Sequence, residues 1–230
     1  MKSYHIYYRL LACLLLACLG QNLSAQNVKQ DIERINEAYR SLKGGQVELE
    51  YRFYAGYDPD NVEITKGRAS WQGVMQKMHT PSIERLQNDQ YAILVNHDMK
   101  AVIIQNAPST STLASPIPLD SMLAICDSIQ FQEKEEGLLS YRFLIGALGF
   151  EAVEVVFNPE SYFIERIVCY QLPWEEGELG DRTEVHYRNL QKLSTTSTAH
   201  FSEQDYVRRD GEQFLLQSAY KGYKLYNFCR

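Results

Sequence analysis

Residues 47–54 read VELEYRFY, and the prediction of the fold starts from this stretch. Valine, leucine, tyrosine and phenylalanine alternate in it with glutamate and arginine, which is the pattern of a strand with one buried side. A turn is expected over residues 57–61 (YDPDN), because Asp, Pro and Asn favour tight turns. Residues 62–72 then predict the returning strand, so the segment as a whole predicts a β-hairpin.

The segment before this hairpin predicts an amphipathic helix. Its apolar residues recur at spacings of three and four, which places Val28, Ile32, Ile35, Tyr39 and Leu42 on one stripe. A pair of glycines at positions 44 and 45 ends the pattern. A helix with one apolar stripe needs a dry surface to pack on, and we expect the sheet to supply it.

Strand-like segments continue at short intervals after the hairpin. They lie near residues 74–79, 83–87, 90–96, 100–105, 128–135, 138–145, 151–158, 161–171 and 182–192, with a last strand-like run over 214–228. A second helix is expected near 119–126, after a Pro/Ser/Thr-rich loop over 107–118. Short connections require mostly antiparallel pairing, and so large a sheet should curl. The predicted fold is α+β and mostly β: an unclosed, strongly curled antiparallel β-barrel of about ten strands, with two or three helices covering its concave face.

Composition and charge exclude several classes of protein. The chain has 230 residues, of which 45% are hydrophobic and 23% are charged, as in an ordinary globular protein and unlike a disordered or fibrous one. Its formal charge is -6 and no stretch is densely basic. A nucleic-acid partner is therefore not expected.

The N-terminus predicts an export signal. Lys2 and Arg9 precede ten consecutive apolar residues at 10–19 (LLACLLLACL), and Ala25 stands where a signal peptidase would cut. Ten helical residues rise about 15 Å, half of a hydrocarbon core of roughly 30 Å. This segment is thus too short for a membrane span.

We expect residues 1–25 to be a signal peptide and residues 26–230 to form a single β-rich domain. An alternative is a lipid anchor on Cys18, because residues 15–18 (LLAC) have the layout of a lipobox. Both alternatives place the mature chain outside the cytoplasm.

Three cysteines follow the signal segment, at positions 126, 169 and 229. A bridge between Cys169 and Cys229 is the favoured pairing, because both lie in strand-like segments. Three unpaired thiols that act as small apolar residues are an equal alternative.

No motif predicts catalysis, a metal or a cofactor. The histidines lack the spacing of metal ligands, and there is neither a G-x-S-x-G elbow nor a phosphate loop. Glu184 and His186 share one side of a predicted strand and are expected to form a solvated pair. The acidic stretch 175–181 is expected to be a solvated loop. We expect no catalytic residue, no metal ligand and no cofactor.

Apolar residues on one side of the curled sheet, with the stripe of the first helix, form the candidate ligand site. They are Ile32, Ile35, Tyr39, Val47, Leu49, Tyr51, Phe53, Ile93, Val95, Ile103, Val153, Val155 and Phe157. Small barrels fill their interior with side chains, whereas larger open ones leave a cavity. Both a ligand cavity and a packed core are open at this point.

The order of elements resembles the periplasmic outer-membrane lipoprotein carrier family (LolA-like and LolB-like). The similar stretches are 35–42 (INEAYRSL), 62–67 (VEITKG), the strand pair 91–104, and 155–160 (VVFNPE) before 164–167 (IERI). The resemblance implies an unclosed antiparallel barrel with helices over an apolar cavity, in a periplasmic protein that is not an enzyme. It implies a lipidated protein or lipid as partner, held through acyl chains, with peripheral contact to a membrane. The alternative is an envelope sensor or assembly accessory protein that uses the same fold to bind a protein partner.

Overall fold

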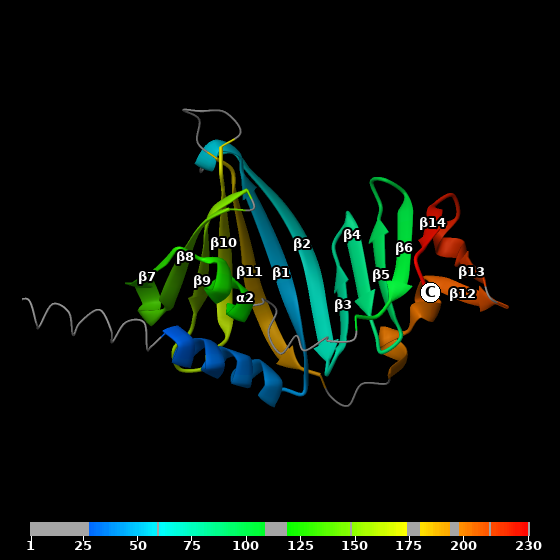
Figure 1. The fold of residues 1–230 in the computed structure, drawn as a ribbon, viewed down its shortest axis with the longest axis horizontal. Coiled ribbons are helices and arrows are strands. Elements are labelled where there is room, and N and C mark those ends of the chain that lie inside the picture. Colours follow the sequence, from blue (N-terminus) through cyan, green and yellow to red (C-terminus); the bar gives the residue numbers. More distant parts are fainter. Residues whose placement is uncertain are drawn as a thin grey trace, which may run out of the picture.

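One twelve-stranded sheet organises the molecule (Figure 1), a computed structural model that describes residues 28–58, 60–108, 119–147, 149–173, 180–193, 198–211 and 213–229. The strands are β1 (Gly44–Tyr54), β2 (Val62–Gln72), β3 (Met75–His79), β4 (Ile83–Gln87), β5 (Tyr91–Asn96), β6 (Ala101–Asn106), β7 (Ser128–Glu133), β8 (Leu139–Ala147), β9 (Phe150–Phe157), β10 (Ile164–Gln171), β11 (Arg182–Lys192) and β14 (Lys224–Asn227). Their order across the sheet is β14-β6-β5-β4-β3-β2-β1-β11-β10-β9-β8-β7. The predicted signal peptide and Cys18 lie outside the described residues.

The sheet curls strongly but does not close, because its end strands β7 and β14 do not pair with each other (Figure 1). The expected fold class, an unclosed and curled β-barrel, is confirmed, with twelve strands in the sheet instead of about ten. Pairing is antiparallel throughout except between β6 and β14, which run parallel. The parallel pair arises because β14 reaches the sheet edge after a long excursion and not through a hairpin.

The hairpin predicted from residues 47–72 is the centre of the sheet. β1 and β2 pair without interruption from Gly44 opposite Gln72 to Tyr54 opposite Val62. On its other edge β1 pairs with β11, with one irregularity between Gln46 and Glu48. The two longest strand pairings of the sheet therefore meet in β1.

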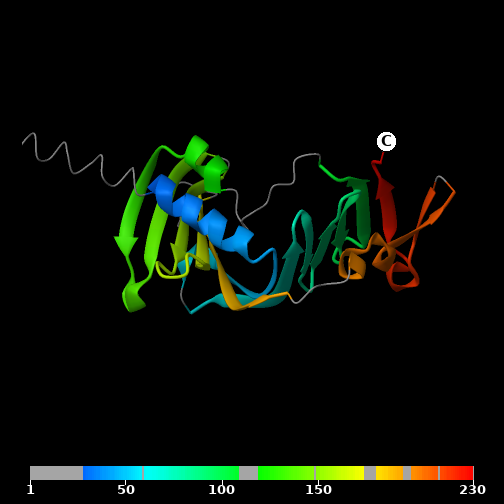
Figure 2. The same cartoon turned by 90° about the horizontal axis from the view of Figure 1, so that it is seen from below.

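Two helices lie inside the curve of the sheet, over its β7–β11 half (Figure 2). They are the helix at residues 28–41 and α2 (Leu119–Ile125). Their apolar side chains share one core with the strands beneath; the buried members are Val28, Ile32, Ile35, Tyr39, Leu119, Met122, Tyr141, Phe143, Ile145, Val155, Phe157, Ile164 and Ile167. Neither helix, within the part of the chain that the structure describes, is long and apolar enough to cross a bilayer.

The side of the sheet that carries these helices is called the helix side here, and the opposite one the outer side. Residues paired across neighbouring strands point to the same side. Val47 faces the helix side and pairs with Ala69, which pairs with Met78. Glu48, one residue on, faces the outer side.

A second core lies on the outer side of β4–β6, under the C-terminal segment. Its buried residues are Leu86, Ile93, Val95, Val102 and Ile104 from the sheet, and Phe201, Tyr206, Val207 and Tyr220 from the segment. That segment contains the small hairpin of β12 (Val207–Asp210) and β13 (Gln213–Leu216) before it reaches β14. The expected single strand over 214–228 is therefore wrong, because a turn at Ser218–Tyr220 divides the run into β13 and β14.

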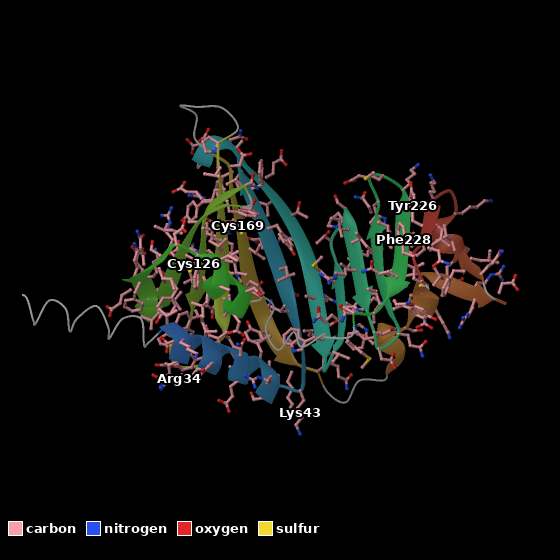
Figure 3. The ribbon with its side chains drawn as sticks, viewed as in Figure 1. Arg34, Lys43, Cys126, Cys169, Tyr226 and Phe228 are labelled. Atoms are coloured by element: carbon pink, nitrogen blue, oxygen red, sulfur yellow. The ribbon has the colours of Figure 1, made fainter. Side chains whose placement is uncertain are left out.

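The favoured Cys169–Cys229 bridge is also wrong, since all three cysteines are free thiols. Cys169 lies in β10, whereas Phe228, the neighbour of Cys229, lies at the opposite end of the sheet (Figure 3). Seven strands separate β10 from β14 in the sheet order, at about 4.8 Å each, and a disulfide tolerates a Cα separation of only about 7 Å. Burial raises the pKa of the Cys169 thiol, which keeps it protonated.

Candidate functional site

A pocket of about 240 Å³ lies on the helix side of the sheet, at the C-terminal end of the first helix. Strands β1, β2, β3, β4 and β11 form its walls. The lining residues are Tyr39, Val47, Leu49, Tyr51, Ala69, Ser70, Trp71, Gln76, Lys77, Met78, Arg85, Val185 and Tyr187. Most of these side chains are apolar or aromatic, which is the usual lining of a small-molecule site.

Tyr39 anchors the first helix at the edge of the pocket. Its side chain is 3% exposed, and its ring centroid lies 5.8 Å from that of Trp71 and 5.3 Å from that of Phe163. The backbone N–H of Ile164 donates a hydrogen bond of 3.2 Å to the Tyr39 hydroxyl. Helix, β2 and β10 are thus tied together where the pocket begins.

The phenols of the pocket stay neutral. Burial raises the pKa of Tyr39, of Tyr51 and of Tyr187 above the ordinary tyrosine value. The Tyr51 hydroxyl donates to the Met78 sulfur at 3.6 Å, so its hydrogen is already engaged in this arrangement. The walls therefore offer a ligand an apolar environment with few polar contacts.

The position of Trp71 depends on a glycine. Trp71 pairs with Gly45 across β1 and β2, and its ring lies directly over the Gly45 backbone. A Cβ atom at position 45 would come within 2.7 Å of Trp71 Cη2, which is a severe overlap. The glycine pair at the end of the first helix thus has a second role, since it makes room for an aromatic wall of the pocket.

Gly45→Ala is expected to destabilise the fold by about 1–3 kcal/mol, the usual cost of overpacking, and to move the Trp71 ring. Urea unfolding measures the first effect, and the Trp71 emission maximum in a Trp174→Phe background measures the second. The matched control is the same change in a Trp71→Ala background, where the overlap is gone. An equal cost in both backgrounds would show that the Trp71 ring does not decide the residue at position 45.

The residues predicted to line a ligand site divide into three groups. Tyr39, Val47, Leu49 and Tyr51 do line the pocket. A second group, Ile32, Ile35, Val153, Val155 and Phe157, lies in the core beneath the helices or packs against it. These five side chains fill the space between helix and sheet and do not line the pocket.

The third group lies outside both the pocket wall and the core beneath the helices. Phe53 and Ile103 point to the helix side but are not part of the pocket wall. Ile93 and Val95 point to the outer side, where they are buried in the second core. The prediction that they share a side with Val47 is wrong, because a strand pattern gives the alternation of side chains and not which side of the sheet is apolar.

Most of the residues in the pocket wall were not predicted from the sequence. The missed residues are Ala69, Ser70, Trp71, Gln76, Lys77, Met78, Arg85, Val185 and Tyr187. Strand register could have found some of them. Val47 pairs with Ala69 and Leu49 with Tyr187, so the cross-strand partners of a predicted lining residue were candidate lining residues as well.

The expected solvated pair of Glu184 and His186 is buried instead. Their exposed fractions are 8% and 7%, and His186 Nε2 lies 2.8 Å from Glu184 Oε2. Burial lowers the pKa of His186, against the effect of the Glu184 hydrogen bond. Both residues point to the outer side of β11, away from the pocket. Within the described ranges no cluster of three His, Cys, Asp or Glu has the arrangement of a metal site.

Comparison with known proteins gives similar solved structures. No protein-family model and no curated protein sequence matches the chain. The neighbours include a LolA superfamily protein. It comes from Nitrosomonas europaea, is 11% identical, and matches with a TM-score of 0.38 over 77% of this chain and 98% of its own.

Two further neighbours cover more of the chain. An uncharacterised conserved protein from Thermus thermophilus is 10% identical, with a TM-score of 0.49 over 89% of this chain and 99% of that one. MucB, in its complex with MucA from Pseudomonas aeruginosa, is 10% identical, with a TM-score of 0.46 over 83% of this chain and 63% of the matched chain.

Proposed function

We propose that this chain is an exported, periplasmic binding protein that holds the apolar part of a lipid or lipidated protein in the pocket beside Trp71. Residues 1–25 are its signal peptide in this proposal, and a peripheral membrane contact delivers the ligand. The observation that carries the proposal is a preformed apolar pocket on the side of the sheet that the helices cover.

The size of the pocket suits part of an acyl chain. About 240 Å³ is below the roughly 300–1,000 Å³ of typical small-molecule pockets, so a long chain would extend beyond it. Burial of each methylene stabilises a complex by about 0.8 kcal/mol, and five methylenes by about 4 kcal/mol. We assign no catalytic role to the pocket, and its described lining residues include no histidine, cysteine or carboxylate.

Trp71 provides the direct test, because the sequence contains two tryptophans. In a Trp174→Phe variant, only Trp71 remains. A polyene fatty acid that absorbs at the emission wavelength of tryptophan should quench Trp71 with saturation at one ligand per chain. The control is the double variant Trp71→Phe, Trp174→Phe, which contains no tryptophan and should show no such quenching signal. Quenching that does not saturate would contradict a defined site.

A second candidate function is the binding of an envelope protein by a sensor or assembly accessory protein. It rests on an apolar strip beyond the pocket, where Leu94, Ile103 and Tyr226 are cross-strand neighbours on the helix side. Leu94 is 37% and Tyr226 38% exposed, and Tyr226 lies near the C-terminal edge of the sheet (Figure 3). Exposed apolar surface of this kind is a feature of protein interaction sites.

Native mass spectrometry of protein purified from host membranes separates the two candidates. Copurified lipid supports the carrier, whereas a stoichiometric protein subunit supports the accessory role. A chain that carries neither would argue against both.

A further inference from the structure

Strand β4 places two polar side chains, Arg85 and Gln87, on the helix side of the sheet. Arg85 lines the pocket and is exposed, and it makes no hydrogen bond or ion pair within the described part of the chain. Gln87 is two positions along, so it points to the same side. It is 2% exposed, and its amide nitrogen has no hydrogen-bond partner. Gln87 is not among the described lining residues, so the polar group of this strand that a ligand in the pocket can reach is Arg85.

The described strands around Arg85 carry no carboxylate on the helix side of the sheet. On the helix side of β3, β4, β5, β6 and β14, the register places two charged side chains, Arg85 and Lys224, and no carboxylate. The excess of positive charge on this surface is opposite to the net charge of the whole chain, in which 29 acidic residues outnumber 23 basic ones. The other cation of the pocket wall, Lys77, is neutralised on the outer side by Asp205 at 2.8 Å.

We infer that the ligand of this pocket is an anionic amphiphile, with an apolar chain against Trp71 and a carboxylate or phosphate group held by Arg85. The inference rests on the proposed function and adds the chemistry of the head group to it. The guanidinium suits such a group because its planar N–H fork matches both carboxylate and phosphate oxygens.

The neighbours of Arg85 favour this contact. Met78 and Leu94 pair with Arg85 from the two adjacent strands, so its neighbours on the helix side are apolar and offer no competing charge. Gln76, which pairs with Gln87 and lines the pocket, adds an amide beside the same spot.

The test compares three single-chain probes below their micelle concentrations: palmitate, palmitoyl lysophosphatidate and monopalmitoylglycerol. Binding is followed by Trp71 emission in the Trp174→Phe chain. We expect both anions to bind about tenfold more tightly than the neutral ester, since a charged hydrogen bond contributes roughly 1.5 kcal/mol. A preference between the anions identifies a free fatty acid or a phospholipid as the source of the group.

Arg85→Gln should remove this preference and leave the affinity for monopalmitoylglycerol unchanged. Arg85→Lys should keep part of it. The matched control is Arg68→Gln, an exposed arginine on the outer side of β2, which should change none of the three affinities.

Two outcomes would overturn the inference. The parent chain could bind charged and neutral probes with equal affinity, or Arg85→Gln could weaken the binding of all three probes equally. Either result excludes a head-group role for Arg85, while the proposal that the pocket binds an apolar chain stands. Absence of saturable binding for every probe excludes the proposed function itself, and the head-group inference with it.

Discussion

Ala69→Leu should reduce acyl-chain affinity more than tenfold and leave the fold intact. Ala69 is half-buried in the pocket wall, between Val47 on β1 and Met78 on β3. A leucine there extends into the space of about 240 Å³ that the ligand needs. Because the space is empty of protein atoms, the usual overpacking cost of about 1–3 kcal/mol should be largely avoided.

Titration of the Trp71-only chain with the polyene fatty acid measures this effect, and urea unfolding measures the stability. Ala124→Leu is the matched control, since Ala124 is exposed on α2, outside the pocket wall. Parental affinity in Ala69→Leu would show that ligands bind elsewhere. Loss of affinity together with loss of the folded state would show that the wall tolerates no added volume.

Tyr206→Ala should destabilise the protein by about 3–5 kcal/mol, the cost of removing a large buried aromatic side chain. Tyr206 is 1% exposed in the outer core, and its ring stacks on that of Tyr220 at 5.7 Å. Its hydroxyl donates a hydrogen bond of 3.2 Å to Glu84 Oε2. The change therefore leaves a cavity and removes one partner of a carboxylate that is largely buried.

Tyr206→Phe is the control, because it keeps the ring and removes only the hydroxyl, at about 1 kcal/mol. Urea midpoints at constant slope report both values. A cost for Tyr206→Ala no larger than that for Tyr206→Phe would mean that the C-terminal segment is not needed to cover the sheet. In either variant the bound polyene fatty acid should still quench Trp71, because the pocket lies on the helix side of the sheet and Tyr206 on the outer side.

Local structure was predictable because period-two alternation and turn residues are local signals. The hairpin from 47 to 72 formed as the spacing indicated, and so did the helix stripe from Val28 to Tyr39. Its last predicted member, Leu42, lies outside the helix, which ends at residue 41. The helix stripe also needed a dry partner, and the sheet supplies one. None of this required knowledge of distant contacts.

The side of the sheet on which each strand is buried was not predictable in this way. Leu86 and Gln87 are adjacent on β4; Leu86 is buried in the outer core, and Gln87 points to the helix side. The apolar partners of Leu86 come from a segment more than a hundred residues later in the chain. The pocket was likewise hidden, because Arg85 and Trp71 are brought together only by the register of β2, β3 and β4.

The outer core has a consequence for the order in which the chain can fold. Five apolar strand residues, Leu86, Ile93, Val95, Val102 and Ile104, are covered by partners at positions 201–220. During export or synthesis from the N-terminus, these strands stay exposed until residues 201–220 follow. Contacts so distant in sequence also form slowly. Uncovered strands of this kind aggregate readily. The β1–β2 hairpin can form early, but the β4–β6 half of the sheet must wait for the C-terminal segment.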